Sequence, residues 1–80
     1  MKTVLVQSKD LDCGYVYSIH ITAEQAEAVL NAQEGDIISL GLDGAWIKVN
    51  KDTVLVRSGS SGGTSPLEKR DVLSQIIAQR

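Results

Sequence analysis

The segment Arg57-Ser-Gly-Ser-Ser-Gly-Gly-Thr-Ser65 carries the residue types in this chain that are best suited to hold an anion. Consecutive backbone N–H groups in a glycine-rich loop can surround a phosphate, and a helix N-terminus adds a favourable dipole. Basic side chains on either side of the loop can add charge-assisted contacts. The sequence therefore predicts a candidate ligand site made of Arg57, Ser60, Ser61, Gly62, Gly63, Lys69 and Arg70.

The same segment also has the composition of a flexible tether. It lacks the Gly-Lys-Ser/Thr ending of a P-loop, and Gly59, Gly62 and Gly63 do not have the Gly-x-Gly-x-x-Gly spacing of a dinucleotide site. Composition alone favours a tether for the C-terminal helix over an anion site, and both interpretations stay open.

Side chains suited to catalysis or metal binding are few. His20 is the only histidine, and Ser18 shares its strand face, but that spacing does not by itself create a hydrogen-bonded pair. Cys13 is the only cysteine, and the neighbouring Asp10 and Asp12 disfavour its thiolate. No bidentate glutamate follows these aspartates at the position that a calcium loop requires. We therefore expect no enzyme activity, no catalytic residue, no metal and no cofactor.

Trp46 is the residue best suited to a binding surface. Strand alternation places it on the same face as Lys48. Tryptophan is enriched at interface hot spots and stacks on planar ligands. Three interpretations remain open for Trp46: the C-terminal helix covers it, a subunit or partner interface buries it, or it stacks on a ligand.

Composition excludes several classes of partner. The formal net charge is −2, from 8 basic and 10 acidic side chains that are mixed along the chain. Clustered basic residues, which general nucleic-acid binding and polybasic membrane contacts both need, are missing. No apolar run approaches the roughly 20 residues of a membrane span, and the apolar stretch among the first residues is too short to predict a secretory signal. With one cysteine, a reducing, cytoplasmic location is the expectation.

These residues must be positioned by a single small domain, because the chain has 80 residues. Alternating apolar runs and turn signals predict an α+β fold in the order ββαβββα, with a mostly antiparallel sheet and two helices. The predicted strands are Lys2–Gln7, Tyr15–Ile21, Asp36–Leu42, Ala45–Val49 and Thr53–Arg57; the first helix is Ala23–Gln33; a Gly/Ser-rich loop over residues 58–65 leads to the C-terminal helix Pro66–Gln79.

Local signals mark the first helix and one hairpin. Thr22 and Gln25 have the spacing of a capping box at the start of the helix. Gly35 stands where a left-handed cap would end it. Between the third and fourth strands, Asp43-Gly44 is a strong signal for a tight hairpin turn.

The C-terminal helix has an equally clear start signal. Ser65 and Glu68 form a second capping box, and Pro66 stands at the first helical position. The helix carries an apolar stripe of Val72, Leu73, Ile76 and Ile77.

Strand alternation divides the strand residues into two sets. The strongly apolar set is assigned to the core and comprises Val4, Val6, Tyr15, Tyr17, Ile19, Ile21, Ile38, Leu40, Leu42, Ile47, Val49, Val54 and Val56. The other set is too apolar for a purely solvated face and too polar for a sealed core, which is typical of a surface that meets a partner. The predicted interface residues are Trp46, Lys48, Leu55, Leu73, Ile76 and Ile77.

We therefore expect a non-catalytic protein-interaction or regulatory module. It binds a second copy of itself or another protein, as small inhibitors or accessory proteins of phage or bacterial type do. In this interpretation the C-terminal helix can pack on a neighbouring subunit. The alternative is a small-ligand-binding protein that holds a nucleotide or phosphate compound with the Gly/Ser loop and its basic neighbours.

Overall fold

The computed structural model describes residues 2–41, 44–57 and 63–80. The α+β class is confirmed, but the strands within these ranges form two antiparallel sheets, β1-β2 and β3-β4-β5-β6. A sixth strand, β6, stands between the fifth strand and the last helix. The elements are β1 (Thr3–Lys9), β2 (Val16–Thr22), α1 (Ala23–Asn31), β3 (Ile37–Ser39), β4 (Trp46–Val49), β5 (Thr53–Arg57), β6 (Thr64–Glu68) and α2 (Lys69–Ala78).

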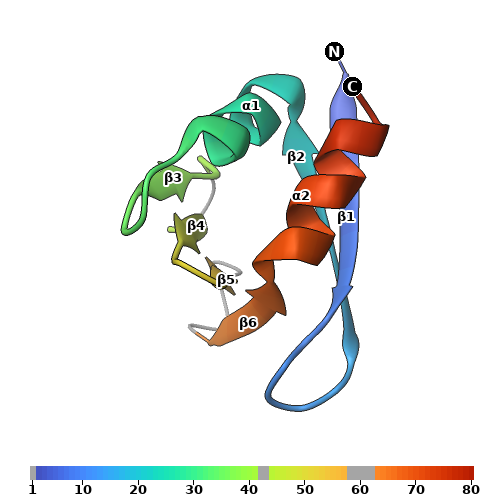
Figure 1. Ribbon diagram of the computed structural model, residues 1–80, viewed down its shortest axis with the longest axis vertical. Helices are drawn as coiled ribbons and strands as arrows, with labels where there is room; N and C mark the ends of the chain where they lie inside the picture. The colour runs from blue at the N-terminus through green and yellow to red at the C-terminus, as the bar shows by residue number, and fades with distance from the viewer. Residues whose placement is uncertain (1, 42–43, 58–62) are drawn as a thin grey trace.

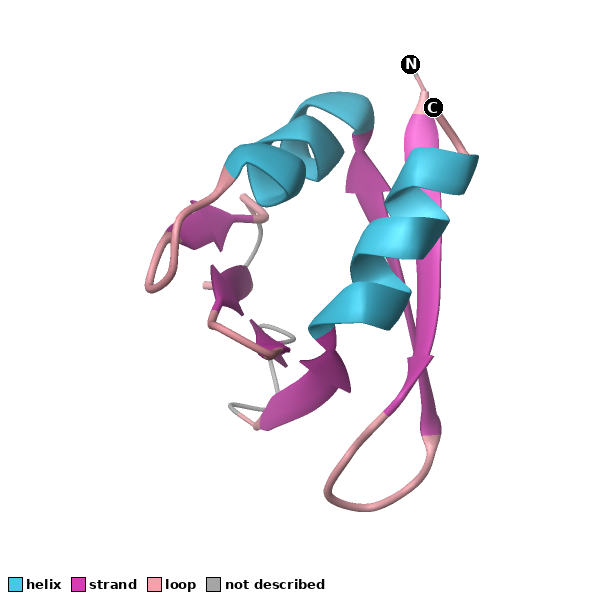
Figure 2. Ribbon diagram, in the orientation of Figure 1, coloured by secondary structure: helices cyan, strands magenta, loops and turns pink. Residues whose placement is uncertain are grey.

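The two sheets and both helices share one apolar core. Figure 1 shows β1 and β2 on one side, β3 to β6 on the other, α1 across one end and α2 running beside β1. Figure 2 shows that both helices lie on the same side of the four-stranded sheet. The buried apolar side chains are Val4, Val6, Ile21, Ala26, Val29, Ile47, Val49, Val54, Val56, Leu67, Val72 and Ile76.

The assignment of core residues from strand alternation is largely confirmed. Tyr17, Ile19, Ile38 and Leu40 are half-buried and pack against the core. Tyr15 is an exception, because it lies in the β1–β2 loop just before β2 begins and is 77% exposed. Of the predicted core residues, Leu42 lies outside the described residues.

The start of α1 follows the local signals, whereas its end does not. The Gln25 N–H donates to the Thr22 hydroxyl, and the Gln25 side chain accepts from the Thr22 N–H, so the capping box is confirmed. The predicted cap at Gly35 is wrong, because α1 ends at Asn31 and its C-cap is Ala32. Gly35 has a left-handed φ of 92° in the following turn, where its N–H donates to the Val49 carbonyl at 2.7 Å.

Strands β3, β4 and β5 form the predicted antiparallel meander. Ile38 lies opposite Ile47, and Ile47 lies opposite Val56. The β4–β5 turn is tight, since the Asn50 N–H donates to the Thr53 carbonyl at 2.9 Å. β3 is shorter than predicted and ends at Ser39. In the β3–β4 turn, Asp43 lies outside the described residues.

The predicted start of the C-terminal helix is wrong. Residues 64–68 form β6, the helix begins at Lys69, and the Glu68 side chain makes no cap hydrogen bond. Residues 64–68 pair with β5 instead of forming this capping box, because the pairing buries Leu67 completely opposite Val54 and so stabilises the strand more. Pro66 is tolerated at this position of β6. Its carbonyl accepts from the Leu11 N–H at 2.9 Å, so the carbonyl and the ring nitrogen both point away from β5, and no hydrogen bond to β5 is lost.

Helix α2 packs on its own chain. Val72 and Ile76 are buried in the shared core. Ile76 was predicted to be an interface residue, but its burial leaves no exposed surface for a partner. The helix contacts β1 more extensively than it contacts any other element. The buried stripe of this helix, Val72 and Ile76, therefore packs on its own chain in the structure, and packing on a neighbouring subunit stays a prediction. Leu73 is half-buried and Ile77 stays exposed.

Two glutamines attach α2 to the edge of β1. The Leu5 N–H donates to Gln79 Oε1 at 2.9 Å, and Gln79 Nε2 donates to the Leu5 carbonyl at 2.6 Å. The Gln7 N–H donates to Gln75 Oε1 at 2.8 Å, and Gln75 Nε2 returns a bond to the Gln7 carbonyl at 2.6 Å. Each side-chain amide thus makes the two backbone hydrogen bonds that a residue of a neighbouring strand would make with β1.

Candidate functional site

The outward side of the four-stranded sheet presents a mixed apolar and basic surface. Successive strand residues point to opposite faces, so the burial of Ile47, Val49, Val54 and Val56 directs their neighbours outward. We call this surface the Trp46 face and define it by Ile37, Trp46, Lys48, Leu55, Arg57 and Pro66.

The strand register sets the neighbours within the Trp46 face. Trp46 lies opposite Arg57. In the next row, Lys48 lies opposite Ile37 on one side and Leu55 on the other, and Leu55 lies opposite Pro66. Directly opposed side chains of antiparallel strands have Cβ atoms about 5 Å apart, close enough to contact each other. The structure therefore brings the predicted interface residues Trp46, Lys48 and Leu55 together.

Neither helix covers the Trp46 face. Trp46 and Leu55 are half-buried, but they lie outside the cluster that forms the core. Both α1 and α2 pack against the opposite side of this sheet, where Val54, Val56 and Leu67 are buried. Of the three interpretations of Trp46, cover by the C-terminal helix is therefore wrong.

Trp46 and Arg57 give this surface its particular chemistry. A guanidinium beside an indole favours cation–π contact, and both residue types are common at interface hot spots. Among the described residues, no group forms a hydrogen bond with the buried Arg57 Nε. Lys48 adds a second positive charge, while Leu55 supplies apolar area. The arrangement suits a partner surface with an apolar centre and carboxylates around it.

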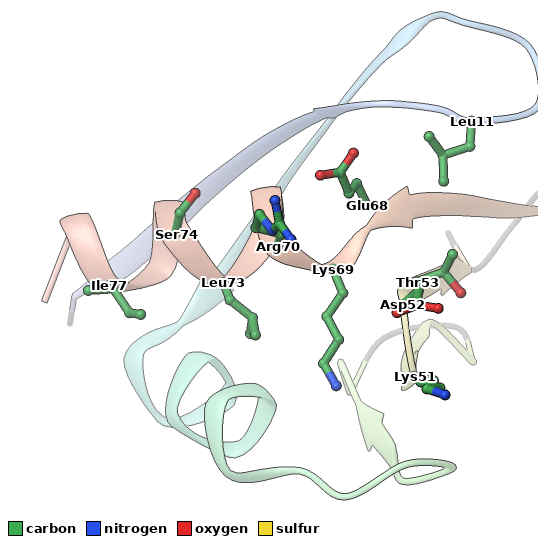
Figure 3. Close-up of a pocket in the computed structure, with 10 residues that line it drawn as sticks. All are labelled: Leu11, Lys51, Asp52, Thr53, Glu68, Lys69, Arg70, Leu73, Ser74 and Ile77. Carbon is green, nitrogen blue, oxygen red and sulfur yellow. The ribbon is translucent and has the colours of Figure 1, made fainter.

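A second concave surface lies at the start of α2. It is an open groove of about 800 Å³ between α2 and the β4–β5 turn. In Figure 3, Lys69, Leu73 and Ile77 project from the same side of α2, and Lys51 and Asp52 lie across from Lys69. The groove thus combines an apolar wall with charges of both signs. Sequence reasoning missed it, because it depends on the packing of α2 beside a turn from another part of the chain.

The predicted anion site is not assembled as a single site. Arg57 pairs with Thr64 at one end of β6, whereas Lys69 and Arg70 follow its other end. A strand of this length separates the two ends by roughly 13–17 Å. Ser60, Ser61 and Gly62 lie outside the described residues, and Gly63 is exposed. Lys69 and Arg70 line the groove instead.

Asp10 anchors the loop between β1 and β2. Its carboxylate accepts from the Asp12 N–H at 2.7 Å and from the Cys13 N–H at 3.2 Å. These bonds, led by the one from Asp12, together with one from the Ser65 hydroxyl, lower the pKa of Asp10 below its ordinary value. In the sequence, Asp10 is a neighbour that disfavours the Cys13 thiolate and part of an incomplete calcium loop. The structure gives it a role in docking the loop against β6.

The residues considered for catalysis do not meet in one site. His20 and Ser18 lie on an exposed face of β2, where the Ser18 hydroxyl accepts from Gln7 Nε2 at 3.2 Å. Cys13 is exposed in the β1–β2 loop. Within the ranges that the structure describes, no three His, Cys, Asp or Glu side chains are grouped to hold a metal ion.

The chain matches no protein-family model, no curated protein and no solved structure. Among the described residues, neither helix is long and apolar enough to cross a membrane. The Trp46 face and the groove are therefore the features of this protein that indicate a function.

Proposed function

We propose that this protein is a non-catalytic interaction module that binds another protein through the Trp46 face. The observation that carries this proposal is the pairing of Trp46 with Arg57 on a sheet face that both helices leave uncovered. Such aromatic and arginine anchors supply much of the binding energy at protein interfaces. A module of this kind acts on its partner by occupying a surface, which fits an inhibitor or accessory protein.

The size of the Trp46 face favours a regulatory contact over a permanent one. Four strands spaced about 4.8 Å apart, with three to five residues each, give a face roughly 10–17 Å on a side. Stable complexes bury about 800 Å² on each partner, which is more than this face alone offers. Lys48 and Arg57 strengthen association with an acidic partner by electrostatic steering, so binding should weaken as the salt concentration rises.

The test compares partner binding by matched single variants. The wild-type protein, Trp46→Ala and Ile77→Ala are immobilised and exposed to extract from the source cells, and the bound protein is identified and its affinity measured. We expect Trp46→Ala to weaken binding by about 30-fold or more, the effect of losing a hot-spot side chain. Ile77→Ala, in the groove, should bind like the wild type. Equal binding by all three would refute the proposal, provided that circular dichroism shows intact folds.

The alternative function is binding of a small anionic ligand, such as a nucleotide, in the groove. Lys51, Lys69 and Arg70 line it, and none of them forms an ion pair with another described residue. Thermal-shift measurements with nucleotides and inorganic phosphate test this alternative. A stabilisation that Lys69→Gln abolishes and Gly63→Ala preserves would place the ligand in the groove. The reverse pattern would place it at the Gly/Ser loop, and no stabilisation by any anion would count against the alternative.

A further inference from the structure

Strand β2 has an open edge. Leu5 and Gln7 direct their backbone N–H and C=O groups to the α2 glutamines, away from β2. Their partners across the ladder are His20 and Ser18, so these pairs are the non-hydrogen-bonded ones. The backbone groups of Ser18 and His20, and those of Val16 by the same alternation, therefore point away from β1. Among the described residues, no further strand pairs with this edge.

The other sheet edges carry protection that β2 lacks between Val16 and His20. Gln75 and Gln79 pair with the edge of β1. On β3, the Ser39 carbonyl accepts from Gln25 Nε2 at 3.4 Å. On β6, Pro66 has no N–H to offer, and its carbonyl accepts from Leu11. Proteins protect exposed strand edges because such edges pair with other chains. The seven residues of β2 include no proline, glycine, lysine or other charged residue.

The inner side of β2 is also incompletely covered. On β1, Val4 and Val6 are both buried. Along β2 the same side goes from Ile21, which is 2% exposed, through half-buried Ile19 and Tyr17 to Tyr15 beyond its end, which is 77% exposed. Among the described residues, apolar cover is therefore incomplete along the edge whose backbone groups point away from β1.

We propose that β2 pairs antiparallel with β2 of a second copy of this chain, about a two-fold axis at Ser18. Ser18 then lies opposite the Ser18 of the other copy, and Val16 lies opposite its His20. Three hydrogen-bonded pairs give about six backbone hydrogen bonds. The register does not extend to Thr22, because its N–H already donates to Gln25. This surface is separate from the Trp46 face, so the inference goes beyond the proposed function.

A second copy suits this edge better than an unrelated strand. Antiparallel pairing about a two-fold axis is self-complementary, and β2 places no like charges opposite each other. On the inner side, Tyr17 of each copy lies opposite Ile19 of the other and supplies the missing apolar cover. Pairing also converts two two-stranded sheets, which are marginal on their own, into one four-stranded sheet.

The test uses opposite charges at the two-fold axis. Ser18→Lys places two ammonium groups on directly opposed residues, and Ser18→Glu does the same with carboxylates. Sedimentation equilibrium of the wild type should show a dimer that dissociates on dilution. Each variant alone should have a dissociation constant raised by at least about tenfold. An equimolar mixture of the two variants should recover dimer formation. Ser74→Lys, an exposed position on α2, is the control for added charge and should dimerise like the wild type.

Amide exchange supplies a second readout. The N–H groups of Val16, Ser18 and His20 should exchange more slowly in wild-type dimer than in the Ser18→Lys variant. A strictly monomeric wild type at millimolar concentration would overturn the inference. A dimer that Ser18→Lys leaves unchanged would overturn it as well, because a different surface would then hold the copies together. A dimer lost in Trp46→Ala but kept in Ser18→Lys would assign self-association to the Trp46 face. Pairing of β2 only with a strand of another protein would also overturn the inference, because the partner of β2 would then not be a second copy of this chain.

Discussion

The buried Asp10 carboxylate couples the fold to pH. Hydrogen bonds, first of all from the Asp12 N–H, lower its pKa below the ordinary value of 3.8. A carboxylate with a lowered folded-state pKa stabilises the protein above its unfolded-state pKa, and this stabilisation is lost as pH falls through the folded-state value. We expect Asp10→Asn to lower the Tm at pH 7, and the difference from the wild type to shrink below pH 3.8.

Asp12→Asn is the matched control for that experiment. Asp12 uses its backbone N–H, while its own side chain is exposed. The Tm of Asp12→Asn should equal that of the wild type across the pH range. If thermal melts of Asp10→Asn between pH 7 and pH 2.5 kept a constant distance from the wild type, ionisation of Asp10 would not be the cause of the lost stability.

Gly35 and Gly63 differ in backbone conformation, which predicts different responses to alanine. Gly35 has a φ of 92°, and a Cβ added there would meet no atom within 4 Å. The cost of Gly35→Ala is therefore conformational alone, about 1–2 kcal/mol of unfolding free energy. Gly63 lacks a left-handed φ and also has open space, so Gly63→Ala should change stability by less than about 0.5 kcal/mol. Urea unfolding distinguishes the two, and an equal effect would contradict the strain argument.

At the scale of elements, the edge of β1 depends on two glutamine side chains. Gln75 and Gln79 each make two bonds with the β1 backbone. Replacing either with alanine should lower the unfolding free energy by about 1 kcal/mol, since the backbone groups can turn to water. Gln33→Ala is the control, because that exposed side chain makes no hydrogen bond with the described residues. Chemical denaturation that gave the same midpoint for Gln75→Ala and Gln33→Ala would show that the pairing does not stabilise α2.

Helix α2 supplies one face to the core and leaves another exposed. Ile76 is fully buried, whereas its neighbour Ile77 is 57% exposed. Ile76→Val should cost about 0.5–1.5 kcal/mol of unfolding free energy, and Ile77→Val should be nearly neutral. Denaturant midpoints of the two variants measure the difference. Comparable losses would mean that α2 does not pack on its own chain as the structure has it.

Elements with local signals could be predicted from the sequence, and elements that depend on distant partners could not. Thr22 and Gln25 are three residues apart, so their capping box is visible in the chain. Ser65 and Glu68 have the same spacing, but Leu67 gains more by burial opposite Val54, and only the β5–β6 pairing shows this. Local capping is worth about 1 kcal/mol, less than burying a leucine side chain.

The same distinction applies to the candidate surfaces. Strand alternation correctly placed Trp46, Lys48 and Leu55 on one face, because that alternation depends only on neighbouring residues. The pairing of Gln75 and Gln79 with β1 could not be predicted, since glutamines on a helix give no sign of meeting a strand edge some 70 residues away. Without that contact, the free edge of β2 could not be distinguished from that of β1.

At the scale of the whole molecule, the two sheets depend on one core. Val6 of β1, Ile47 of β4 and Ile76 of α2 belong to the same buried cluster. Neither sheet has a separate apolar core, so loss of one should expose the other. A small domain of this kind is expected to unfold in a single cooperative transition.

Trp46 makes this expectation testable, because it is the only tryptophan and lies on the sheet face remote from both helices. Its fluorescence reports the four-stranded sheet, while circular dichroism at the helical wavelengths reports α1 and α2. At one protein concentration, the two signals should give coincident urea transitions. A fluorescence transition at lower urea than the helical one would show that the four-stranded sheet opens first. The shared core would then be too weak to couple the unfolding of the two sheets. In that case the burial of Ile47 and Val56 would not depend on the packing of α2.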